Sequence, residues 1–100
     1  MADFVEGDRA TYYAYCKQSD GSVFDITNYA PKLRFSINGA VASVKAMTKE
    51  DAANGEASYR FETTELVNGE MESEVFLLDG SSHPITCRDP VVHIVRKKVG

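Results

Sequence analysis

The sequence predicts an all-β sandwich or barrel, and two observations predict it. Turn signals recur every ten to twenty residues along the 100-residue chain, and the segments between them alternate polar and apolar residues. Such alternation is typical of strands with one buried face. The turn signals are Glu6-Gly7-Asp8, Ser19-Asp20-Gly21-Ser22, Asn38-Gly39, Asn54-Gly55, Asn68-Gly69 and Asp79-Gly80. Their glycine and asparagine residues tolerate positive φ, and the spacing between them leaves segments of strand length.

Five segments are predicted to be strands, in chain order 11–16, 32–37, 57–62, 70–77 and 91–95. The first is rich in aromatic residues, which suit a pleated surface. The next three alternate, and the last is a run of apolar residues suited to a closing strand. The residues expected to point inward are Tyr13, Leu33, Phe35, Ile37, Ala57, Tyr59, Phe61, Met71, Ser73, Val75 and Leu77.

The segment 41–55 is ambiguous. Val41, Val44 and Met47 recur at helical spacing in an alanine-rich run, and Gly55 could be the C-cap of a helix. Local pattern alone leaves helix and strand equally supported here. A helix at this point would make the fold α+β.

Composition excludes several classes of protein. The length allows one domain, which we expect to span residues 1–100 with a short lead at 1–6 and a basic tail at 96–100. A net charge of -4 argues against nucleic acid as the partner. No apolar run is long enough for a membrane span, and the first residues do not resemble a secretory signal. We therefore expect Cys16 and Cys87 to remain free thiols in the compartment of synthesis.

Little in the sequence indicates catalysis or a cofactor. The best group of metal-ligating residues is His83 with Cys87, and His93 and Cys16 as distant additions, but the spacing does not match a known metal motif. A Cys87–His nucleophile pair lacks surroundings that would lower the thiol pKa, apart from Arg88. We expect no enzymatic activity, no metal and no cofactor, with the tyrosines serving mainly in the core.

Charge is unevenly distributed and indicates a candidate interface. Six acidic residues lie between positions 62 and 79 with no lysine or arginine among them, whereas positions 96–98 are basic. One interpretation is a solvated strand face followed by a charged terminus. The other is an acidic face on one copy that meets the basic end of another. The candidate interface residues are Arg96, Lys97, Lys98, Glu70, Glu72 and Glu74.

The order of these motifs resembles a known family. Asp25-Ile26-Thr27-Asn28 is similar to an Asp-Leu-Thr-Gly signature, and the Asn-Gly and Asp-Gly turns follow it in a familiar order. Over almost the whole chain the pattern resembles the immunoglobulin-like N-terminal domain of phage baseplate upper proteins and related phage tail modules. The resemblance implies an immunoglobulin-like antiparallel β-sandwich of about seven strands, and a strand at 41–47.

The resemblance also implies a function. Such domains are structural proteins of the virion, assembled in the host cytoplasm, without enzymatic activity. They dock one phage component onto another, often as a homo-oligomer or symmetric array. We expect a tail or baseplate component or adaptor, with a capsid decoration protein as an alternative. The other alternative is a β-sandwich that binds carbohydrate or a receptor on the host surface, using the expected exposed aromatics Phe24, Tyr29 and Phe76.

Overall fold

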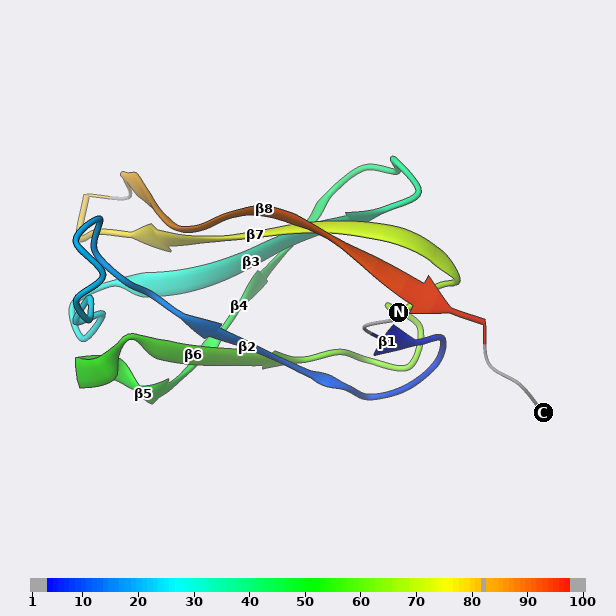
Figure 1. Cartoon of the computed structure of the whole chain (residues 1–100), viewed down its shortest axis with the longest axis horizontal. Helices are drawn as coiled ribbons and strands as arrows, with labels where there is room; N and C mark the ends of the chain where they lie inside the picture. The colour runs from blue at the N-terminus through cyan, green and yellow to red at the C-terminus, as the bar shows by residue number, and fades with distance from the viewer. Residues whose placement is uncertain (1–3, 82, 98–100) are drawn as a thin grey trace.

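The alternating segments fold into two packed β-sheets in the computed structural model, which describes residues 4–81 and 83–97, with side chains for all of these except 88–91. The described residues form eight strands and one 3₁₀ turn (Figure 1). In chain order these are β1 (Phe4–Val5), β2 (Thr11–Tyr15), β3 (Ala30–Ile37), β4 (Ser43–Ala46), β5 (Thr48–Asp51), η1 (Ala52–Asn54), β6 (Glu56–Arg60), β7 (Gly69–Leu78) and β8 (Pro84–Arg96).

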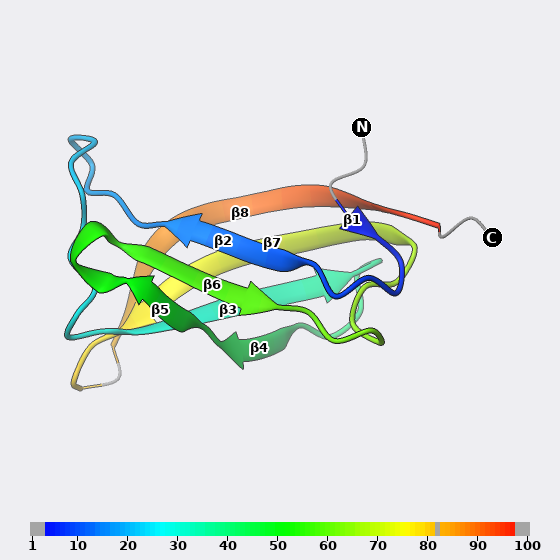
Figure 2. The same ribbon diagram turned by 90° about the horizontal axis from the view of Figure 1, so that it is seen from below.

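The strand order is that of an immunoglobulin-like sandwich. One sheet has the order β1-β8-β7-β3-β4, and the other has the order β2-β6-β5 (Figures 1 and 2). All the pairs are antiparallel except β1 with β8, which is parallel. In the seven-stranded immunoglobulin fold the second strand pairs with the fifth and the fifth with the fourth, while in the other sheet the sixth strand lies between the third and the seventh. β2-β6-β5 and β3-β7-β8 repeat these two arrangements, with β4 as an added edge strand next to β3. The predicted immunoglobulin-like β-sandwich is therefore confirmed, with β1 as an additional short edge strand.

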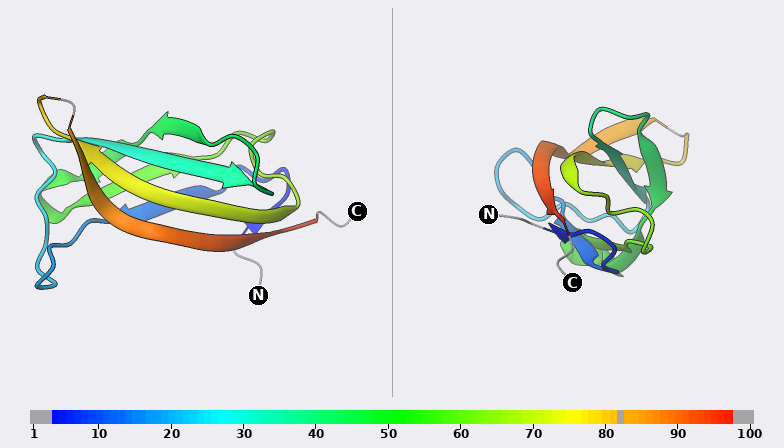
Figure 3. Two further views of the ribbon diagram at one scale, coloured as in Figure 1. Left: turned by 90° about the horizontal axis from the view of Figure 1, so that it is seen from above. Right: turned by 90° about the vertical axis from the view of Figure 1, so that its right-hand side faces the viewer.

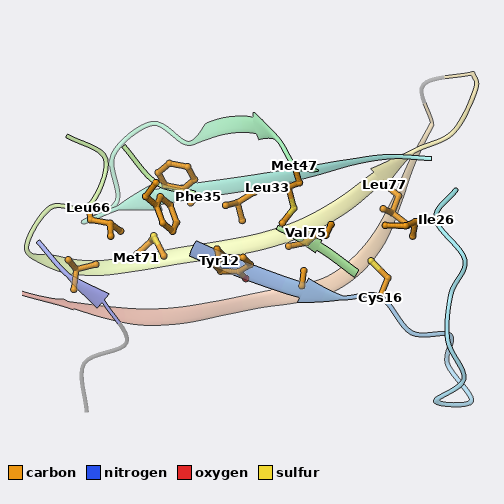
Figure 4. Packing of buried hydrophobic residues seen from close by; sticks show 14 residues of the cluster. Tyr12, Cys16, Ile26, Leu33, Phe35, Met47, Leu66, Met71, Val75 and Leu77 are labelled. Atoms are coloured by element: carbon orange, nitrogen blue, oxygen red, sulfur yellow. The ribbon is translucent and has the colours of Figure 1, made fainter. Parts of the chain in front are cut away.

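The two sheets face each other in the end-on view of Figure 3, and the buried side chains lie between them. Buried side chains come from both layers, and Figure 4 shows how they interleave. Leu33, Phe61, Met71, Val75 and Leu77 are all fully enclosed. The predicted inward faces of the three alternating segments are thus confirmed, because side chains two residues apart point to the same side of a strand.

The inward orientation predicted for Tyr13 is wrong. Tyr12 is 3% exposed and Tyr13 is 51% exposed. The side of β2 that faces the core is therefore the one that carries Tyr12, and Tyr13 lies on the opposite side. The hydroxyl of Tyr12 lies 3.1 Å from Ser73 Oγ, inside the core. In Thr-Tyr-Tyr-Ala-Tyr there is no contrast between polar and apolar residues that would reveal which side faces the core.

The ambiguous segment 41–55 contains two strands and one turn of 3₁₀ helix. β4 and β5 occupy Ser43–Ala46 and Thr48–Asp51, and Met47 between them is buried. Gly55 is a C-cap, as the helical interpretation required, but it ends only the three-residue η1 at φ +74°. The strand implied by the resemblance is present, and the α+β alternative is excluded.

The expectation of free thiols is wrong. Cys16 and Cys87 form a disulfide across the sandwich, between the end of β2 in one sheet and β8 in the other. The two residues lie 71 positions apart in the chain, and only the fold brings them together. In antibody domains the corresponding bond joins the second strand to the penultimate one, so this bridge is displaced by one strand.

The expected lead and tail both contribute to the sheet. Phe4 and Val5 pair with Val95 and Arg96, and the backbone N–H of Glu6 donates to the carbonyl of Arg96 at 2.8 Å. The ring of Phe4 packs on Tyr12, Phe61 and His93. β1 thereby closes one end of the sandwich, while the disulfide closes the other.

Candidate docking surface

Four of the six candidate interface residues lie together on the face of the five-stranded sheet that points away from the core, here called the outer face. Its members on β3, β4, β7 and β8 are Lys32, Arg34, Ser36, Val44, Glu70, Glu72, Glu74, Phe76, Val92, Ile94 and Arg96. Lys97 is exposed directly after β8. Lys98 lies outside the described residues.

The ladder between β7 and β8 places acidic and apolar side chains side by side. Glu70 lies opposite Ile94 and Glu72 lies opposite Val92, and residues directly opposite each other in a ladder share one face of the sheet. Ile94 and Val92 are 42% and 57% exposed. The acidic row of β7 is therefore bordered by an exposed apolar strip on β8.

The acidic and basic groups are neighbours on one copy. Arg96 lies two residues beyond Ile94, the partner of Glu70, so Arg96 and Glu70 are diagonal neighbours on the sheet. Glu74 forms an ion pair with Arg34, with 3.4 Å between Glu74 Oε1 and Arg34 Nη1. Among the described residues, neither Glu70 nor Glu72 takes part in an ion pair, and Glu72 lies midway along the row.

The outer face is hollowed around Glu72. One depression of about 280 Å³ and a second of about 200 Å³ share Ser36 and Glu72 in their walls, with Glu74 and Arg34 bordering the first and Glu70 and Val92 bordering the second. The first hollow is lined mainly by polar atoms, and the second by polar and apolar atoms in equal measure. Both hollows suit side chains from a partner surface better than an enclosed small molecule, for which sites are usually deep and apolar.

The residues considered for catalysis and metal binding are engaged elsewhere. Cys16 and Cys87 are bonded to each other, so neither offers a thiolate as nucleophile or ligand. His83 Nδ1 lies 3.6 Å from Asp79 Oδ2 on an exposed turn. Among the described residues, no group of three or more histidine, cysteine or acidic side chains is arranged to hold a metal ion, and no helix has the length and apolar character to cross a membrane.

One serine and one histidine do lie within hydrogen-bonding distance. Ser73 Oγ lies 3.0 Å from His93 Nε2, and the same hydroxyl contacts Tyr12. Ser73 is only 1% exposed, so a substrate cannot reach its oxygen. This chain of three polar groups joins β2, β7 and β8 within the core, and its role is to satisfy buried polar atoms.

The aromatic residues considered for carbohydrate binding are half-buried. Phe24 and Tyr29 contact each other edge to face at 5.3 Å between ring centroids, and with Gln18 and Asp25 they line a depression of about 250 Å³. Phe76 lies apart from them, on the outer face. The most exposed tyrosines are Tyr13 and Tyr15 on β2, which sequence reasoning placed in the core or left unassigned.

These features define an immunoglobulin-like β-sandwich with a mixed acidic and apolar surface on its larger sheet. No protein-family model matches the sequence, and no curated protein matches it.

Proposed function

We propose that the chain is a non-enzymatic structural protein of a phage particle, a tail or baseplate component or adaptor that docks one virion part onto another. The observation that carries the proposal is the outer face, where Glu70 and Glu72 lie without ion-pair partners in the described structure beside exposed Val92 and Ile94. Apolar side chains provide contact area, and charges at the rim direct orientation and partner choice. The sandwich topology agrees with the module that the order of sequence motifs resembles.

The docking partner in this proposal is a basic and partly apolar surface of another virion protein. Glu72 provides the central negative charge, and the hollows on either side of it accept side chains from the partner. Arg96 and Lys97 lie at one end of the face and favour an acidic group there. Repetition of the contact around a particle compensates for a small area in each copy.

The disulfide supports a location on the virion. Disulfides persist in oxidising settings, which include virion surfaces, and are rare in the cytosol. In this proposal the chain is assembled in the host cytoplasm with both cysteines reduced. After the particle is released, an oxidant of the extracellular medium such as dissolved oxygen takes two electrons and two protons from the thiols, and the Cys16–Cys87 bond forms. A capsid decoration protein remains an alternative location for the same docking chemistry.

The proposal is tested on purified particles of the phage that carries the gene. We expect the chain to be detected in them by mass spectrometry. The double variant Glu70→Lys/Glu72→Lys should be incorporated at least about tenfold less, since reversing charges at an interface costs more than 1.4 kcal/mol. Asp8→Lys is the matched control, because Asp8 is exposed in a loop away from the outer face.

Particles that lack the chain would overturn the virion assignment. Normal incorporation of the double lysine variant would overturn the outer face as the docking surface. Truncation after Val95 is a poorer test, because Arg96 pairs with Val5 and its loss would release β1.

The second candidate function is recognition of a carbohydrate or receptor on the host surface. The observation that favours it is the depression formed by Phe24 and Tyr29 with Gln18 and Asp25, since aromatic faces combined with polar groups suit sugar rings. Binding of the purified chain to a glycan array, abolished in Tyr29→Ala, would support this function. An array without any bound glycan would leave the docking proposal as the better account.

A further inference from the structure

The strand β2 presents an unpaired edge of its sheet. Each sheet ends in two edge strands, and in the three-stranded sheet these are β2 and β5. Figure 2 shows β2 at the margin, with β6 and β5 following it in the same layer. In many immunoglobulin-like folds the first strand covers this edge, but here β1 pairs with β8 instead.

The backbone geometry shows which groups point outward. The carbonyl of Ala10 accepts a hydrogen bond from the N–H of Phe61 at 2.9 Å, and the N–H of Cys16 donates to the carbonyl of Gly55 at 2.8 Å. Backbone groups alternate along an antiparallel strand, so the even-numbered residues of β2 face β6. Thr11, Tyr13 and Tyr15 direct their N–H and C=O groups to the open side, and none of the described residues pairs with these groups.

The edge strands β2, β4 and β5 differ in how well they are protected against pairing with another chain. Natural edge strands are protected by charges, prolines, bulges or shortness. β5 carries Lys49, Glu50 and Asp51 and has an irregular register. β4 is four residues long and carries Lys45. β2 consists of Thr-Tyr-Tyr-Ala-Tyr, with no charge, no proline and a regular register, and it exposes Tyr13 and Tyr15 by 51% and 53%.

We propose that β2 is a self-association edge, at which a second copy of this chain adds its own β2 in antiparallel orientation. The centre of the pairing is Tyr13 opposite Tyr13 of the other copy, with Thr11 opposite Tyr15 on either side. In this register the outward residues of both strands exchange both of their N–H···O=C bonds. Aromatic side chains opposite each other add stabilisation to the pair.

The charges next to the edge add a small preference for this antiparallel arrangement, because Arg60 of one copy and Glu56 of the other would lie three strand spacings apart, about 14 Å. Arg60 lies beside Thr11 and Glu56 lies beside Tyr15 in the ladder between β2 and β6. Pairing Thr11 with Tyr15 of the second copy aligns Arg60 of each copy with Glu56 of the other in one row across the joined sheets. A parallel arrangement would instead align Arg60 with Arg60 and Glu56 with Glu56.

We expect a single contact between two β2 strands to be weak. The contact also leaves the outer face free to dock. A five-residue strand buries less than the roughly 1,000 Å² of a stable interface, so we expect dimers at high micromolar to millimolar concentration. The outer face belongs to the other sheet, and it remains exposed in both copies. The inference thus goes beyond the docking proposal, and either can fail without the other.

The test is the solution mass of the purified chain by sedimentation equilibrium from micromolar to millimolar concentration. We expect a monomer–dimer equilibrium in the wild type. Tyr13→Lys and Tyr13→Glu should each weaken it at least about tenfold, since each places like charges opposite each other across the two-fold axis. An equimolar mixture of the two variants should restore dimers, because lysine then faces glutamate. Val41→Lys is the matched control, because Val41 is 96% exposed in the loop between β3 and β4 and belongs neither to the β2 edge nor to the outer face.

A second measurement uses the wild type alone and does not depend on a variant that folds. Hydrogen exchange should show the amides of Thr11, Tyr13 and Tyr15 gaining protection as concentration rises, whereas those of β5 do not change. A wild type that stays monomeric throughout the range would overturn the proposal. So would dimers that persist in both Tyr13 variants, a mixture that fails to associate, or added protection that falls on β5 and not on β2.

Discussion

At the scale of single residues, Gly55 is a position at which the backbone of other segments leaves no room for a side chain. Its φ is +74°, and an added Cβ would lie 2.6 Å from the carbonyl oxygens of Cys16 and Phe24. Those oxygens belong to the backbone, so they cannot move aside as a flexible side chain can. The Asn54-Gly55 turn is visible in the sequence, but the close approach of two other segments to Gly55 is a property of the fold.

We expect Gly55→Ala to lower the free energy of unfolding by more than about 2 kcal/mol, as both left-handed backbone and steric overlap contribute. The matched control is Gly39→Ala, with φ +75° and no atom within 4 Å of the added Cβ. That variant should lose only about 1 kcal/mol. Urea unfolding of the two variants measures the difference, and equal losses would show that the overlap at Gly55 is relieved by movement.

Tyr59 connects different parts of the fold through the carboxylate of Glu65. Its hydroxyl donates to both carboxylate oxygens of Glu65, at 2.7 and 2.9 Å, and Glu65 also lies 3.6 Å from Lys45 Nζ. The bonds tie β6 to the loop before β7 and to β4. Burial and the neighbouring Glu65 carboxylate raise the pKa of Tyr59 well above its ordinary value.

Tyr59→Phe should lower the free energy of unfolding by about 1–2 kcal/mol at neutral pH. Because the folded-state pKa is raised, the contribution of Tyr59 is present below the unfolded-state pKa of about 10 and is lost as pH rises above it. The wild type should therefore lose stability above pH 10 more steeply than Tyr59→Phe. Urea unfolding across this range measures the two slopes, and parallel slopes would contradict the assignment.

At the scale of elements, the alternating strands could be predicted and the phase of β2 could not. Polar and apolar residues alternate in β3 and β7, so the buried side is visible in the sequence. β2 has aromatic residues on both sides, and only packing selects Tyr12 for the core. The acidic row of β7 was also identified from sequence, whereas its neighbours Val92 and Ile94 depend on the register with β8.

The disulfide could not be predicted because nothing local indicates it. Cys16 and Cys87 are 71 residues apart, and their proximity follows only from the stacking of the two sheets. The sequence argument inferred reduced thiols from the absence of a recognisable signal, which concerns compartment and not geometry. The bond joins the two sheets covalently at one end of the sandwich.

Removing the bond in Cys16→Ala/Cys87→Ala should lower the free energy of unfolding by about 4 kcal/mol, the loop-closure value for a loop of this length. Urea unfolding with and without a reducing agent measures the effect. The reductant should destabilise the wild type by a similar amount and leave the double variant unchanged. A reductant effect of the same size on both proteins would contradict a role for this bond.

At the scale of the whole molecule, the sandwich is elongated, with extents of 43 × 23 × 23 Å. β1 and the end of β8 lie at one end of the long axis, and the η1 turn lies at the other (Figure 1). The outer face and the β2 edge belong to different sheets. One copy can therefore contact a partner through its larger sheet while its smaller sheet continues into a neighbour.

The disulfide also determines how the molecule responds to tension. If the chain is a component of a phage particle, as proposed, contraction of the particle or injection of its genome would exert a pulling force on it. If the chain is pulled from its two ends, the covalent bond carries the load between Cys16 and Cys87, and the residues between them cannot be stretched out. About 240 Å of contour length, at roughly 3.3–3.6 Å for each of the 71 positions, stays locked in place. Only β1, β2 and the C-terminal part of β8 can yield, so an oxidised domain lengthens far less under tension than a reduced one.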